Sequence, residues 1–131
     1  MKRNPEALVR AYLDAIAAKR IDELDTLLAA DVRFVGPMSN LTGLADVKAA
    51  FRRVSSIHVK SDIERMFTDG DEVCVIYDFV TDTIGGLPTV EWIHVRDGRI
   101  QSIRIYYDQV PFQRAREEIA RRMQAAAQPN A

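Results

Sequence analysis

Apolar residues in the first 54 positions recur with the period of a helix. Leu8, Tyr12 and Ile16 are four residues apart and follow Asn4-Pro5, a typical cap and first turn. The predicted elements are a helix over 5–19, a second helix over 22–30, a short strand over 32–35, a loop over 38–42 and a third helix over 42–54. This part of the chain is therefore predicted to be mainly helical.

From position 57 onward the apolar period changes to two, which is typical of strands. The pairs Asp69-Gly70, Gly85-Gly86 and Asp97-Gly98 suit tight hairpin turns. They separate four strands predicted over 57–67, 72–83, 88–96 and 100–109. Helices followed by an antiparallel meander indicate an α+β domain.

Strict alternation assigns a face to each strand residue. Glu91 falls on the inward face with Ile93, although a register shifted by one residue would turn Trp92 and His94 inward instead. His58 alternates outward and is predicted to be exposed. The outward set is unusually apolar for a face that meets water, with Ile76, Val80, Trp92, His94 and Tyr106 near its centre. A second copy of the chain would cover it, so we expect a homodimer.

Composition narrows the class of protein. The chain has 131 residues, of which 47% are hydrophobic and 28% charged, as expected for one soluble globular domain spanning 1–131. A net charge of −1 argues against nucleic-acid partners and against a basic membrane patch. No apolar run is long enough for a membrane span and no signal-peptide core is visible, so a cytoplasmic location is expected.

Three segments carry a family resemblance: 8–16 with 22–32, Gly36-Pro37 leading through 41–43, and 97–100 with 103–108. On these the chain resembles the NTF2-like superfamily, in its SnoaL-like and ketosteroid-isomerase-like group, over about 5–112. The resemblance implies a cone-shaped α+β fold. Three N-terminal helices would pack on a strongly curved antiparallel sheet and enclose an apolar pocket. The tail over about 112–127 is predicted to add a C-terminal helix.

The resemblance also bears on single positions. Tyr12 matches the tyrosine that donates a hydrogen bond to the substrate oxyanion in ketosteroid isomerases, although a purely structural core tyrosine is the alternative. The aspartate base of those enzymes corresponds to Gly36, which carries no acid. Limonene-type epoxide hydrolases use an inward carboxylate where this chain has Ile105. Neither mechanism is therefore expected in its usual form.

Few inward polar residues remain to carry chemistry. Glu91 is the candidate acid or base, with Tyr12 or Tyr107 stabilising an oxyanion. A structural carboxylate paired with an arginine is the alternative for Glu91. Asp108 is interpreted as a cap or ion-pair residue, and Ser61 as a further inward polar side chain. The predicted ligand-binding wall comprises Ile16, Phe34, Met38, Val47, Phe51, Val59, Tyr77, Phe79, Ile93 and Ile103.

Three functions stay open. The first is a cofactor-free isomerase, cyclase, dehydratase or hydrolase acting on a small apolar organic molecule. The second is a domain that binds such a molecule without catalysis, and the third is a dimeric interaction module. One cysteine and two histidines far apart in the sequence match no metal-ligand spacing, and no phosphate-binding loop is present, so neither a metal nor a cofactor is expected.

Overall fold

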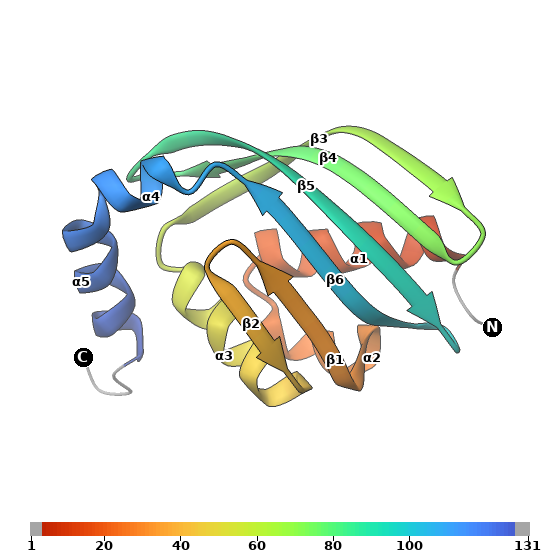
Figure 1. Cartoon of the computed structure of the whole chain (residues 1–131). Helices are drawn as coiled ribbons and strands as arrows, with labels where there is room; N and C mark the ends of the chain where they lie inside the picture. Colours follow the sequence, from red (N-terminus) through yellow and green to blue (C-terminus); the bar gives the residue numbers. More distant parts are fainter. Residues whose placement is uncertain (1–3, 128–131) are drawn as a thin grey trace.

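The computed structural model describes residues 4–127 and shows a curved sheet packed on helices (Figure 1). The helices are α1 (Pro5–Ala17), the short 3₁₀ helix η1 (Ile21–Glu23), α2 (Leu24–Leu27), α3 (Leu44–Val54), α4 (Val110–Arg114) and α5 (Arg116–Ala127). The strands are β1 (Leu28–Gly36), β2 (Ser39–Thr42), β3 (His58–Asp69), β4 (Glu72–Thr81), β5 (Gly85–Arg96) and β6 (Arg99–Tyr107).

The six strands form one sheet in the order β2-β1-β6-β5-β4-β3. Every neighbouring pair is antiparallel except β1 and β6, which run parallel. Figure 1 shows the sheet arching over α1 and α3, with α4 and α5 at one end. The predicted α+β architecture is confirmed, with one parallel pair added to the expected antiparallel sheet.

The region between α1 and α3 differs from the prediction. The helix predicted over 22–30 ends at Leu27, because Leu28 already pairs with Ile100 of β6. The loop predicted over 38–42 is strand β2, in which Ser39 pairs with Gly36. In both places the backbone N–H and C=O groups find hydrogen-bond partners in a neighbouring strand. The local sequence does not show which strand will lie beside them.

The four-strand meander follows the predicted turns closely. Asp97 and Gly98 both have positive φ, 54° and 76°, as a tight Asp-Gly hairpin requires. Beyond the turn the pairing of β5 with β6 shifts by one residue between His94 and Val95, after which Glu91 pairs with Ile105 and Ile93 with Ile103. The predicted register is confirmed: Glu91 is 2% exposed, whereas Trp92 beside it is 48% exposed.

Strand β3 departs from strict alternation near its start. The pairing of β3 with β4 shifts between His58 and Lys60, a bulge that places one extra residue in β3. As a result His58 is buried and stacks on Phe79, with ring centroids 4.5 Å apart, while Val59 is exposed. The prediction of an exposed His58 was wrong, because alternation alone does not show a bulge.

The tail is helical, as predicted, but is divided into α4 and α5. Asp108 accepts a hydrogen bond from the backbone N–H of Val110 at 3.0 Å and so caps the chain that follows. Among residues 4–127, no helix is long and apolar enough to cross a membrane. The cytoplasmic location stays a prediction.

Candidate functional site

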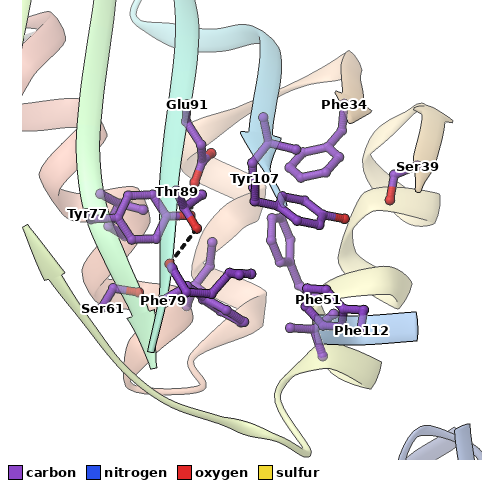
Figure 2. A pocket seen from close by; sticks show the side chains of 15 residues that line it. Phe34, Ser39, Phe51, Ser61, Tyr77, Phe79, Thr89, Glu91, Tyr107 and Phe112 are labelled. Carbon is purple, nitrogen blue, oxygen red and sulfur yellow. Dashed lines mark hydrogen bonds between the residues drawn. The ribbon is translucent and has the colours of Figure 1, made fainter. Parts of the chain in front are cut away.

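A cavity of about 110 Å³ lies between the concave face of the sheet, α1 and α3. Figure 2 shows its walls, which come from helices and strands far apart in the sequence. Seven predicted site residues line it: Ile16, Phe34, Phe51, Tyr77, Phe79, Glu91 and Tyr107. It is also lined by residues outside that predicted set, namely Leu13, Ser39, Val54, Ser61, Leu87, Thr89, Ile105 and Phe112.

Glu91 is the acidic residue on the cavity wall, and two tyrosines hold it. The hydroxyl of Tyr12 on α1 donates a hydrogen bond to Glu91 Oε1 at 2.7 Å. The hydroxyl of Tyr77 on β4 donates to Glu91 Oε2. No arginine pairs with Glu91 among the ion pairs of residues 4–127, so the alternative of an arginine-paired carboxylate is wrong.

Burial is the main cause of the pKa shifts in the triad formed by Glu91, Tyr12 and Tyr77. Loss of solvation raises the pKa of Glu91, and the hydrogen bonds from Tyr77 and Tyr12 oppose that rise only in part. Burial, reinforced by the Glu91 charge, also raises the pKa of Tyr12 and of Tyr77 well above the ordinary value. Both tyrosines therefore remain donors, and the carboxyl group is the member of the triad that exchanges a proton most readily.

The other two predicted catalytic residues occupy different places. Tyr12 is fully buried and does not line the cavity, and its hydroxyl contacts the carboxyl group of Glu91. Tyr107 does line the cavity, and Figure 2 shows its hydroxyl directed away from Glu91. Tyr77, predicted as part of the wall, is the second hydrogen-bond partner of the acid.

The position of Gly36 has no room for an acid. A Cβ built there would lie 2.4 Å from Cγ2 of Ile105, a side chain that itself lines the cavity. A substituent at residue 36 would have to displace Ile105. Neighbouring side chains thus fill the place that an aspartate would need, and Glu91 stands without a second inward acid in the cavity wall.

Five predicted wall residues lie elsewhere. Val47, Ile93 and Ile103 are buried in the hydrophobic core without lining the cavity. Met38 lies in the turn between β1 and β2 and is 55% exposed. Val59 is 54% exposed because of the bulge in β3. Residues 4–127 contain no group of three His, Cys, Asp or Glu side chains arranged to hold a metal.

Comparison with known proteins agrees with this architecture. A family model described as the SnoaL-like domain matches residues 9–103. The chain belongs to the SnoaL-like domain family. This result confirms the resemblance found in the sequence, and no curated protein matches the chain.

Solved structures extend the comparison. A protein from Kribbella flavida DSM 17836 is 27% identical, with a TM-score of 0.78 over 88% of this chain and 95% of that one. A steroid delta-isomerase from Pseudomonas aeruginosa is 22% identical, with a TM-score of 0.76 over 95% of both chains. A de novo designed protein with a curved β-sheet is 20% identical, with a TM-score of 0.75 over 92% and 98%. An enzyme and a designed protein share this fold, so the fold alone does not specify an activity.

Proposed function

We propose that this SnoaL-like protein binds a small apolar organic molecule in the cavity, and that Glu91 transfers a proton to or from that molecule without a cofactor. One observation carries the proposal: a buried carboxyl group on an otherwise largely apolar wall, held by two tyrosine hydroxyls. Such a constellation is typical of a positioned acid or base.

The geometry suits proton transfer in either direction. Each carboxylate oxygen accepts one tyrosine hydrogen bond and keeps a lone pair for a substrate proton. Burial raises the pKa of Glu91 toward neutral pH. A general acid or base works best when its pKa is close to the pH of the reaction. Tyr107, on the same cavity wall, would donate to an oxygen on which negative charge develops. Isomerase, cyclase, dehydratase and hydrolase reactions can all use these steps.

Ring opening of 5-nitro-1,2-benzisoxazole tests proton abstraction directly, because a base that removes its C3 proton breaks the N–O bond and releases a coloured phenolate. We expect Glu91→Gln to lower the protein-catalysed rate about a hundredfold with the fold intact. Glu72→Gln is the matched control, since Glu72 lies on the opposite face and accepts a hydrogen bond from Trp92. A parent protein that does not accelerate the reaction would overturn the catalytic proposal.

Binding without catalysis is the second candidate. It is favoured by the tyrosine hydrogen bonds, which stabilise the carboxylate and make it a weaker base. In that case the neutral fluorophore N-phenyl-1-naphthylamine should bind while the benzisoxazole stays intact. Phe79→Trp, which narrows the cavity, should weaken that binding. Unchanged binding would mean that the fluorophore does not enter this cavity.

We also propose that two copies of the chain pair through the outer face of the sheet. Trp92 and Tyr106 are each 48% exposed there, beside the partly buried Ile76 and Val80. Covering this aromatic and aliphatic surface would stabilise a dimer. Light scattering after size-exclusion chromatography should give about twice the chain mass. A monomer of 14.8 kDa at micromolar concentration would overturn this proposal.

A further inference from the structure

A buried histidine and a serine form a second polar group at the cavity. His58 is 3% exposed, and its Nε2 lies 3.0 Å from Oγ of Ser61. Ser61 lines the cavity, and Figure 2 shows it on the same side as Tyr77 and Phe79. The bulge in β3 places His58 on the same face as Ser61, so this pair exists only because the strand departs from strict alternation.

This pair lies at a different level of the sheet from Glu91. Ser61 pairs with Phe79 of β4, whereas Glu91 pairs with Val75 of the same strand. Four residues along a strand correspond to about 13 Å. Ser61 and Glu91 therefore lie at two separated levels of the cavity wall, with Tyr77 and Thr89 at the level between them.

The surroundings of His58 favour one of its two neutral tautomers. Nδ1 is buried and has no hydrogen-bond partner among the described residues. A buried N–H without an acceptor is rarer in proteins than an acceptor without a donor, which favours the tautomer protonated on Nε2. Burial also lowers the pKa of His58, which keeps the ring neutral near pH 7. Nε2–H then donates to Ser61, and the hydroxyl hydrogen of Ser61 remains available to the cavity.

Thr89 provides an internal contrast. Its hydroxyl also lines the cavity, but it donates to the backbone oxygen of Leu87 at 2.9 Å, the bond drawn in Figure 2. That hydrogen is already used within the protein. Among the described hydrogen bonds, Ser61 donates to no protein acceptor in this tautomer.

We propose that Ser61, oriented by His58, donates a hydrogen bond to a carbonyl or ether oxygen of the ligand, at a point remote from the atom that exchanges a proton with Glu91. The inference rests on the proposed binding function and narrows its ligand class. The preferred ligand is an elongated apolar molecule with an acceptor oxygen near one end. Ser61 is thus a specificity-determining residue.

Two probes of similar shape test this assignment: 2-acetylnaphthalene, which has an acceptor oxygen, and 2-ethylnaphthalene, which has none. Calorimetric titration of Ser61→Ala should show binding of the ketone weakened about five- to tenfold, the size of one hydrogen bond, with the hydrocarbon unchanged. Thr89→Val is the matched control and should leave the ratio of the two affinities as in the parent.

The ring nitrogens of His58 give a second measurement that needs no ligand. The protein contains two histidines, so ¹⁵N spectra can be assigned with His94→Gln. We expect Nε2 of His58 to be protonated and Nδ1 to be unprotonated.

The inference is overturned if Nδ1 carries the proton, if Ser61→Ala weakens both probes equally or neither, or if Thr89→Val has the same effect as Ser61→Ala. Those results would not affect the test of Glu91 with the benzisoxazole, so the proposed function would still stand. If neither probe binds the parent, proposed binding and this inference fail together. Loss of proton transfer alone, with the ketone preference retained, removes only the catalytic proposal.

Discussion

The two faces of β5 place similar chemistry in opposite surroundings. Glu91 and Trp92 are neighbours, yet one lies in the core and the other meets solvent. Each face of the sheet has a glutamate that accepts hydrogen bonds: Glu91 of β5 from Tyr12 and Tyr77, and Glu72 of β4 from Trp92 at 2.9 Å. On the inner face burial raises the pKa of Glu91. Glu91 is thus a candidate catalyst because the sheet and helices bury it. Burial removes solvation and so destabilises the charged form of its carboxyl group.

The largest expected difference between the faces is in stability. Ile93 is fully buried, so Ile93→Ala should lower the free energy of unfolding by about 2–5 kcal/mol. His94→Ala, one residue along and exposed, should change it by less than about 0.5 kcal/mol. Urea denaturation measures both. Equal losses would contradict the assignment of the two faces.

The tyrosine partners of Glu91 give the next largest effect. Tyr77→Phe removes a donor that favours the charged carboxylate, so the pKa of Glu91 should rise further. Tyr106→Phe, on the outer face, should leave it unchanged. The carbonyl band of the protonated acid, followed by infrared spectroscopy against pH and identified with Glu91→Gln, reports the change. A fall in the pKa after Tyr77→Phe would refute this account.

Stability should also depend on pH through Glu91. Its pKa is raised in the folded state, so the folded protein holds a proton that the unfolded chain has already released. The resulting stabilisation is fully present below the ordinary value of 4.5 and is lost as pH rises through the folded pKa. Each pH unit between the two values corresponds to about 1.4 kcal/mol. Glu91→Gln should lack this slope in urea titrations, whereas Glu72→Gln should retain it.

The smallest effect is expected from the hydrogen bond on the outer face. Trp92→Phe removes the exposed N–H bond to Glu72 and should cost less than about 0.5 kcal/mol at concentrations where the chain is monomeric. Unfolding at several protein concentrations measures it. A loss that grows with concentration would place Trp92 in a contact between two copies and so sharpen the contrast between the faces.

Local sequence was sufficient where turns and period two act together. The Asp97-Gly98 turn and the alternation of β5 predicted that Glu91 points inward, and the structure confirms it. The same pattern gave the outward direction of Trp92 and Tyr106. Alternation along β5 fixes the face of each of its residues, and it holds even though the pairing with β6 shifts by one residue between His94 and Val95.

Sequence patterns were insufficient where a distant strand decides the structure. Leu28 joins β1 because Ile100 lies beside it, and the bulge at Val59 follows from the pairing of β3 with β4. Tyr77 was assigned to the correct face, but its hydrogen bond to Glu91 depends on how β4 and β5 are aligned. None of these contacts leaves a local signal, because the partners are far apart in sequence.

The sequence by itself determined the α+β class, the hairpins and the facing of Glu91, since these depend on neighbours along the chain. Only the tertiary structure decided that Glu91 is buried, that Tyr12 and Tyr77 are its donors, and that His58 reaches Ser61. The physical reason is that burial and its effect on a pKa depend on all the surrounding elements at once. The pKa and the hydrogen bonds of Glu91 therefore depend on how α1 and the curved sheet surround it.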